Sequence, residues 1–204
     1  KAPRMVTFQT ITDVPGSTGE LREMASCKSQ TLAFLNAFDL KLDGSHFEIL
    51  LGPERPEGHQ GNFLPTRKEL KCKATGKTQP TSARWLSVRE IFSDWEYEQP
   101  LDLDIVRLDS MGAAKPPITA DFVAEKLGKI GRELPNQIRF WNLLQEFPLE
   151  MSGDSNGDGR RNLPVNGVNP PEVPFTAAGV AGARQYYASG IYDLLSDEAL
   201  VVKV

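Results

Sequence analysis

Residues 37–52 read AFDLKLDGSHFEILLG, and this stretch decides the fold class. Apolar side chains alternate with polar ones on both sides of Asp43-Gly44, which is the period of a strand with one buried face. An Asp-Gly pair between two such runs favours a two-residue hairpin turn, because the central positions of that turn need positive φ angles. The stretch therefore predicts a β-hairpin with strands at about 37–42 and 46–51.

Further segments with strand-like alternation lie on both sides of this hairpin. They do not alternate with helices, which disfavours a doubly wound nucleotide-binding fold. The expected segments are an extended segment over 3–12, a strand over 69–73 with a turn at Thr75-Gly76, a hairpin over 84–92 and 101–108, and a final strand pair around Ser196-Asp197.

One helical segment interrupts the strands. Apolar residues recur at spacings of three and four after Thr119, which can cap a helix. Pro135 stands inside this pattern, so the stretch 119–147 is predicted to form two short helices or one helix kinked at the proline. The fold class expected is mainly β: an antiparallel β-sandwich or jelly-roll-like fold with a helical segment around residues 119–147.

Three domains are expected along the chain. Residues 1–115 are β-rich, residues 116–175 hold the helical segment and a long loop rich in Gly, Pro and Asn, and residues 176–204 begin further β-structure. The chain opens at Lys1 and closes in LVVKV, an apolar run typical of the middle of a strand. We therefore expect a piece of a longer protein.

Composition narrows the class of partner. The chain has 204 residues, 40% of them hydrophobic, with 23 basic and 27 acidic side chains and a formal net charge of −4. This acidic balance argues against nucleic-acid binding. The sequence contains no run of about 18 apolar residues, so no membrane-spanning helix is predicted. The expected partner is another protein or the remainder of its own longer chain. The location expected for the chain is secreted, periplasmic or lumenal.

The two cysteines, Cys27 and Cys72, leave two alternatives open. A disulfide would tie the N-terminal segment to the middle of the chain, whereas two separate, partly buried thiols would have no such effect.

One loop has part of a metal-binding pattern. Asp154, Asn156 and Asp158 occupy positions one, three and five of a calcium loop, and Gly159 occupies position six. Position twelve is Val165, where a bidentate glutamate would be needed. Calcium is thus the one cofactor candidate, and a polar loop without metal is the alternative.

Residues 94–98 read DWEYE and place acids beside aromatic rings. Rings stack on sugar faces, and a pair of carboxylates can act as acid and base or nucleophile. The alternative is structural, with the acids solvated or paired with Arg89 or Arg107. His59 in its glycine-rich loop can serve as a base, or its imidazole can hydrogen-bond a backbone group. The candidate catalytic residues are Asp94, Glu96, Glu98, Arg89 and His59.

Several short motifs together resemble a known family. They are Gly61–Pro65 (GNFLP), Arg89, the Asp94-Trp95 pair with Glu98, and Asp197–Leu200 (DEAL). In this pattern the chain is similar to the domain of unknown function 1214 family, which is often partnered with domain 1254; Phe63 stands where tryptophan is common. The resemblance implies β-sandwich or jelly-roll domains and no established reaction. The candidate ligand-binding residues are Trp95, Tyr97, Asn62 and Phe63.

Two kinds of function follow from these observations. The leading hypothesis is a non-catalytic β-sandwich module that binds a ligand such as a carbohydrate, or that acts as a subunit of a larger assembly in which its last strand completes a neighbour's sheet. The alternative is a glycan-active enzyme that uses the acidic residues near Asp94–Glu98.

Overall fold

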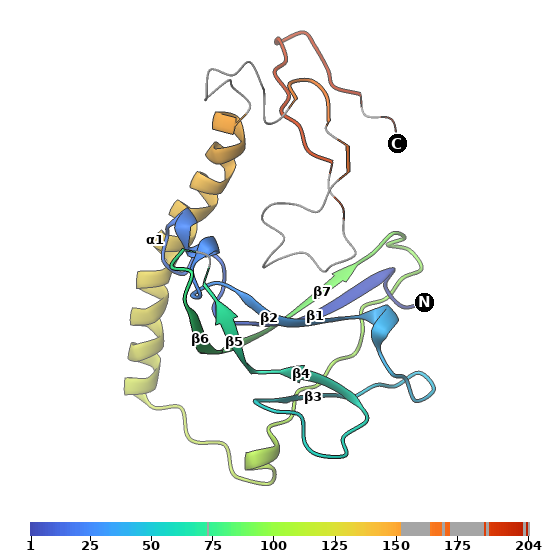
Figure 1. The fold of residues 1–204 in the computed structure, drawn as a ribbon, viewed down its shortest axis with the longest axis vertical. Coiled ribbons are helices and arrows are strands. Elements are labelled where there is room, and N and C mark those ends of the chain that lie inside the picture. Colours follow the sequence, from blue (N-terminus) through green and yellow to red (C-terminus); the bar gives the residue numbers. More distant parts are fainter. Residues whose placement is uncertain are drawn as a thin grey trace.

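The computed structural model describes residues 1–72, 74–151, 164–168, 170–171, 186, 188–201 and 203. These residues form a mixed, strand-rich structure in which small sheets lie beside one long helix (Figure 1). The strands are β1 (Met5–Ile11), β2 (Thr31–Asn36), β3 (Ile49–Gly52), β4 (Asn62–Pro65), β5 (Arg67–Lys71), β6 (Thr78–Ser82) and β7 (Trp85–Ile91). The helices are α1 (Ala120–Met151) and the 3₁₀ helices η1 (Leu21–Ala25), η2 (Ala37–Asp39) and η3 (Leu108–Ser110).

The largest sheet is three-stranded and antiparallel in the order β2-β1-β7. The central strand β1 confirms the extended segment expected over residues 3–12. Two further pairs complete the β-structure: β3 and β4 run parallel, and β5 and β6 run antiparallel. The described residues show no closed sheet and no complete sandwich, so the mainly β fold class is shown only as a strand-rich structure with a helix.

The hydrophobic core lies between β1 and the β3–β4 pair. Val6 and Phe8 on one face of β1 pack with Leu64 of β4, and the ring of Phe47 meets that of Phe8 edge to face at 5.6 Å between centroids. In Figure 1 the β3–β4 pair lies below the three-stranded sheet. Partly buried residues extend this cluster: Ala33, Leu35, Ala37, Leu40, Ile49, Leu51, Leu86 and Leu101.

A tight turn forms where the first hairpin was predicted, but it lies one residue later than the predicted Asp43-Gly44 pair, and its arms do not pair. Asp43 and His46 exchange backbone hydrogen bonds of 2.8 and 3.0 Å, and Gly44 has a φ of 61°, so the central residues are Gly44 and Ser45. The first arm does not form a strand, because residues 37–39 make the 3₁₀ helix η2. The second arm becomes β3, which pairs with β4 and not with residues 37–42.

The amide of Asn62 explains why the hairpin opens. It accepts from the backbone N–H of Lys41 at 2.7 Å and donates to the carbonyls of Lys41 and Glu48, both at 2.9 Å. These are the positions that would face each other two residues beyond the turn. A buried side chain thus takes the backbone groups that the second rung of the hairpin would use.

Only the first strand of the second predicted hairpin forms. β7 lies within the predicted range 84–92, but residues 101–108 form no strand, and β7 pairs with β1. Where the chain returns toward β7, the N–H of Leu101 donates to the Glu90 carboxylate at 2.8 Å. This side chain takes the place of a backbone carbonyl of β7 as the partner.

The β5–β6 ribbon contains a strand that the sequence did not reveal. β5 covers most of the strand expected at 69–73, and the turn at Thr75-Gly76 is confirmed by a 2.7 Å bond from the Gly76 N–H to the Cys72 carbonyl. β6 was missed because its residues TQPTS are polar and include Pro80.

The predicted helical segment is confirmed, and it is continuous. The Thr119 hydroxyl accepts from the N–H of Phe122 at 3.2 Å, as expected for a capping residue. The helix runs through Pro135, so the alternative of two short helices is wrong. The proline ring faces the residue four positions earlier, which is Gly131, and this glycine has no side chain to add to the crowding.

Helix α1 is attached through the loop before η1. The side-chain amides of Asn136 and Gln137 donate to the carbonyls of Ser17 at 3.0 Å and Pro15 at 2.9 Å. Gly19 has a φ of 73°, and a Cβ there would lie 3.1 Å from the Asn136 Cα. The loop therefore requires glycine where the helix approaches.

A disulfide joins Cys27 to Cys72, with 5.1 Å between the Cα atoms. It is the first of the two alternatives that the sequence left open. The bond links the segment before β2 to the turn of the β5–β6 ribbon.

The last segment shows a turn without strands. The N–H of Glu198 donates to the Leu195 carbonyl at 3.1 Å, which places a turn at Ser196-Asp197. Among residues 186, 188–201 and 203 no strand forms, so the expected strand pair is wrong there; a single bridge joins Val165 to Ile191.

Candidate functional site

The acidic turn after β7 is organised by Asp94. Its carboxylate accepts from the backbone N–H groups of Glu96 at 3.1 Å and Tyr97 at 3.3 Å, and its carbonyl accepts from the N–H of Glu98 at 2.9 Å. A carboxylate used in this way caps a turn. Asp94 is therefore engaged by its own backbone.

Glu98 is buried and turns toward the N-terminal segment. Its carboxylate accepts from the N–H of Ser93 at 3.0 Å, the Ser93 hydroxyl at 2.9 Å and the N–H of Arg4 at 3.0 Å. The Lys1 ammonium lies 3.7 Å away. Burial by itself raises the pKa of Glu98, but the hydrogen bonds from Ser93 and Arg4 together with the Lys1 charge lower it, and the net pKa lies below its ordinary value of 4.5.

The lowered pKa of Glu98 predicts acid sensitivity. The stabilisation is present above the pKa of the unfolded chain and is lost as the pH falls through the lower pKa of the folded state. We expect Glu98→Gln to lower the urea midpoint at pH 7 and to flatten its decline between pH 5 and 3. Urea titrations followed by circular dichroism measure this. Glu96→Gln, at an exposed neighbouring position, serves as the control, and equal pH profiles for wild type and Glu98→Gln would contradict the assignment.

The aromatic rings of the turn are exposed. Trp95 is 79% exposed and stacks on Phe92 with 4.7 Å between ring centroids, and Tyr97 is also exposed. Of the neighbouring acids, Glu98 points to Lys1 and Asp94 caps the turn. The third acid, Glu96, is exposed between the two rings.

His59, Asn62 and Phe63 form a separate structural cluster. The His59 imidazole Nε2 lies 3.2 Å from the Asn62 carbonyl, which agrees with the structural alternative for this histidine. The Arg55 guanidinium lies 5.0 Å from the Phe63 ring centroid and donates to the carbonyls of His59 and Gly61. Asn62 uses its amide on Lys41 and Glu48, as described above.

Arg89 lies apart from both groups. Its position on β7, opposite Thr7 of β1, places it on the face of the sheet that turns away from the core. No hydrogen bond or ion pair joins Arg89 to Asp94, Glu98 or His59 in the described part of the chain. In the described residues, the hydrogen bonds between candidate catalytic residues stay within the turn 94–98, and none reaches Arg89 or His59.

The metal candidates cannot be placed in the same way. Asp154, Asn156 and Asp158 lie outside the described residues. Among the residues that are described, no group of three or more His, Cys, Asp or Glu side chains could hold a metal ion. No helix of the described residues is both long and apolar enough to cross a membrane.

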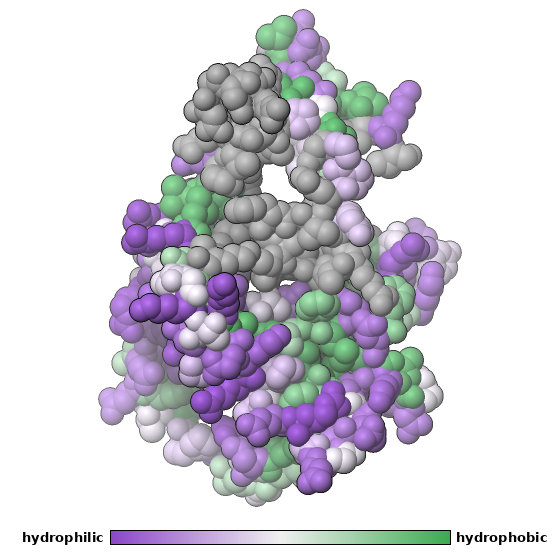
Figure 2. Space-filling view, viewed as in Figure 1, coloured by the Kyte–Doolittle hydropathy of each residue, from purple (hydrophilic) through white to green (hydrophobic). Residues whose placement is uncertain are grey.

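The clearest surface feature is an apolar stripe along α1. Its six side chains are between 43% and 63% exposed although they recur at helical spacing. They are Val123, Leu127, Ile130, Leu134, Ile138 and Trp141, and we refer to them as the α1 stripe. Figure 2 shows apolar (green) side chains at the surface among the polar ones.

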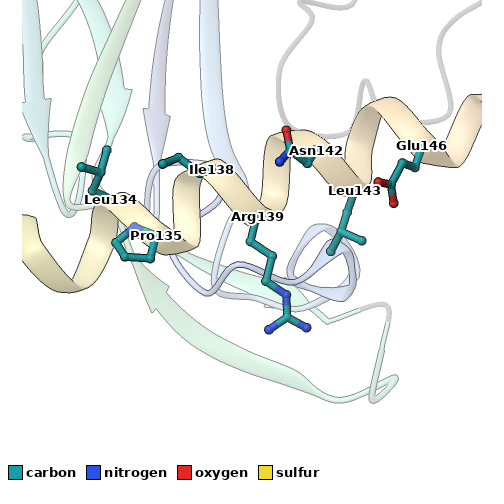
Figure 3. Close-up of a pocket in the computed structure, with 7 residues that line it drawn as sticks. All are labelled: Leu134, Pro135, Ile138, Arg139, Asn142, Leu143 and Glu146. Atoms are coloured by element: carbon teal, nitrogen blue, oxygen red, sulfur yellow. The ribbon is translucent and has the colours of Figure 1, made fainter.

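A groove of about 550 Å³ lies along the same helix (Figure 3). Leu134 and Ile138 belong both to the groove and to the α1 stripe. The full lining is Leu134, Pro135, Ile138, Arg139, Asn142, Leu143 and Glu146. The apolar stripe is thus bordered by a hollow with polar groups at its edge.

Comparisons with family models, curated proteins and solved structures give no match for this chain. The function must be argued from the geometry alone.

The α1 stripe was visible in the sequence as a helical period, but not as an exposed surface. The spacing of Val123, Leu127, Ile130 and Leu134 indicates one face of a helix, which in most helices faces the core. In α1 the buried anchor is Phe140, on a different face of the helix, and only the structure shows this.

Proposed function

We propose that the chain is a non-catalytic subunit of a protein assembly and that it binds a second copy of itself through the α1 stripe. The observation that carries the proposal is the exposure of six large apolar side chains in one line. Covering apolar surface gains about 25 cal/mol per Å², and contiguous apolar patches on soluble proteins mark interaction sites.

The attachment of α1 keeps the stripe outward. Asn136 and Gln137 bind the loop before η1, and Phe140 is buried on the same side of the helix. The Lys129 ammonium lies 5.9 Å from the Trp85 ring centroid, on the β7 side of the helix. The helix lies along the long axis of the molecule beside the strands (Figure 1), and each side chain of the α1 stripe is more than 40% exposed.

A second copy is the favoured partner because the stripe is nearly self-complementary. When two α1 helices are placed antiparallel with their centres near Arg132, the facing pairs are Val123 with Trp141, Leu127 with Ile138, and Ile130 with Leu134. A two-fold interface requires this kind of reciprocal match. The large Trp141 then meets the smaller Val123, and the paired stretch is about 27 Å long.

Sedimentation velocity tests the proposal. We expect the wild-type chain to shift from monomer toward dimer as its concentration rises to the order of 100 μM. Ile130→Glu would place a charge at the centre of the interface and should abolish this shift. Glu125→Gln, elsewhere on the same helix, is the matched control and should leave it intact. A wild-type chain that stays monomeric at all concentrations would overturn the proposal.

A second candidate function is carbohydrate binding at the turn after β7. The observation that favours it is the exposed ring of Trp95, which Phe92 holds in place by stacking. A fixed, exposed indole is a suitable surface for a sugar face. Glu98 is buried against Ser93 and Arg4, and Asp94 accepts from the backbone of the turn, which favours binding over glycan cleavage.

The finer fold and the family resemblance are also proposals. The three-stranded sheet and the β3–β4 pair face each other across the core, as the two layers of a β-sandwich would. The motif residues that carry the resemblance to the domain of unknown function 1214 family serve this framework: Asn62 opens the first hairpin, and Glu98 fixes the N-terminal segment.

A further inference from the structure

An exposed Asn-Gly pair, Asn166-Gly167, joins two segments that are distant in the sequence. The backbone N–H of Asn166 donates to the carbonyl of Ile191 at 2.7 Å, and the N–H of Ile191 donates to the carbonyl of Pro164 at 2.9 Å. These two bonds make the bridge between Val165 and Ile191. Residues 164–168 and 190–193 are therefore held side by side.

The side-chain amide of Asn166 extends this bridge. Its oxygen accepts from the backbone N–H of Asp193 at 2.7 Å, and its nitrogen donates to the carbonyl of the same residue at 2.8 Å. The amide thus exchanges a donor and an acceptor with the backbone, as a residue of a neighbouring antiparallel strand does. We call these two bonds together with the two bonds of the bridge the Asn166 clamp.

The backbone of the clamp is closely fitted. Asn166 has a φ of 53°, and among the described residues no other residue except glycine has a positive φ. Asparagine tolerates this conformation better than most residues do. A Cβ at Gly190 would collide with the carbonyl of Gly167 and would lie 3.4 Å from the carbonyl oxygen of Pro164. A side chain at position 190 would therefore push the two segments apart.

An Asn-Gly pair can also react with itself, because glycine has no side chain to keep the asparagine amide away from the following nitrogen. The backbone nitrogen of Gly167 attacks Cγ of Asn166, and the bond from Cγ to Nδ2 breaks. Nδ2 leaves as ammonia and takes the proton of the Gly167 nitrogen with it. Water then opens the resulting succinimide ring at one of its two carbonyl carbons and returns a proton to the nitrogen, which gives aspartate or isoaspartate.

The clamp and this reaction oppose each other. While the clamp is closed, Nδ2 is bonded to the Asp193 carbonyl, and this bond must break before ammonia can leave. After the reaction an oxygen stands where Nδ2 was, so the product has lost its donor and sets an oxygen against the Asp193 carbonyl. Losing a hydrogen bond and leaving two acceptors face to face destabilises the closed state.

We propose that Asn166-Gly167 is a self-modification site, at which deamidation is slow in the closed clamp and, once complete, releases residues 164–168 from residues 190–193. The proposal is independent of the α1 interface. It needs one copy of the chain and water as the only co-reactant.

Mass spectrometry of the full chain, incubated in mildly alkaline buffer and then digested, measures the reaction. Cleavage after Arg161 separates Asn166 from the second Asn-Gly pair of the sequence, Asn156-Gly157. Fragmentation of the later peptide locates the change at Asn166. We expect Asn166 to convert in the wild type, but more slowly than in a free peptide of the same sequence.

A variant that opens the clamp without touching Asn166 makes the test specific. Gly190→Ala should convert Asn166 at least about tenfold faster than the wild type does, because the two bonds to Asp193 are lost. Gly131→Ala, at a glycine where an added Cβ has nothing within 4 Å, is the matched control and should convert as the wild type does. Equal rates in Gly190→Ala and the wild type, or no conversion of Asn166 in either while the free peptide converts, would overturn the proposal.

The release is measured on a mimic of the product. Aspartate tolerates the same positive φ, so Asn166→Asp changes the amide alone. We expect the backbone amide hydrogens of Ile191 and Asp193 to exchange at least about tenfold faster than in the wild type, followed by NMR. Asn142→Asp, the same substitution at an exposed position of α1, is the control and should leave their exchange unchanged. Unchanged exchange in Asn166→Asp would contradict the release.

Discussion

Replacing both Cys27 and Cys72 by alanine is expected to lower the free energy of unfolding by about 4 kcal/mol. The disulfide joins residues 45 positions apart, and closing a loop of that length restricts the unfolded chain by about this amount. The bond has a local role as well, because it holds the β5–β6 ribbon, whose strands are mostly exposed. A two-stranded ribbon is only marginally stable by itself.

Urea unfolding followed by circular dichroism measures this loss. The oxidised wild type should unfold at a clearly higher urea concentration than the double variant, and reductant should bring the wild type close to the variant. Reductant added to the double variant is the control and should change nothing. An oxidised wild type that unfolds at the same midpoint as its reduced form would contradict the expected role of the bond.

Phe140→Ala is expected to cost about 3–5 kcal/mol, the range for removing a buried aromatic side chain. Phe140 is 1% exposed and lies on the side of α1 that packs toward η1. Its loss would leave a cavity beside Asn136 and Gln137, which anchor the helix. The two amide hydrogen bonds would then carry more of the attachment of α1.

The same helix supplies the matched control for this measurement. Ile138→Ala removes a large apolar side chain two positions away, but Ile138 is exposed, so the loss should stay within about 0.5 kcal/mol for a dilute, monomeric chain. Urea titrations of both variants at low protein concentration give the comparison. Equal losses for Phe140→Ala and Ile138→Ala would show that the inner and outer faces of α1 have been assigned wrongly.

Features that depend on local sequence could be predicted. The spacing of Val123, Leu127 and Ile130 and the hydroxyl of Thr119 locate α1, because periodicity and capping act within a few residues. The turns at Gly44 and Gly76 follow from glycine, which tolerates positive φ. The position of β7 follows from its alternation.

Features that depend on distant residues could not be predicted. The arms of the first hairpin separate because Asn62, far along the chain, binds Lys41 and Glu48. The strand expected at 101–108 fails in the same way, since Glu90 takes the N–H of Leu101. In both places a side chain replaces the backbone partner that the local pattern implied.

The candidate site also depends on residues that are distant in the sequence. The pattern DWEYE suggests carboxylates that work together, but Glu98 is directed to Lys1 and Arg4 at the start of the chain. The period of α1 identifies an apolar face without showing that Phe140 occupies the buried side. The pairing of β1 with both β2 and β7 joins segments far apart in the chain, which the pattern of a single strand does not specify.

The central claim, that two copies join through antiparallel α1 stripes, is tested most directly by a distance between the copies. A spin label is placed at Asp121 on a non-canonical amino acid, so that the Cys27–Cys72 disulfide remains intact, and the label-to-label distance is measured by double electron–electron resonance. With the helix centres near Arg132, the labels should lie about 33 Å apart along the helix axes. A separation near about 10 Å, as for parallel helices, or the absence of any distance between copies, would contradict the account.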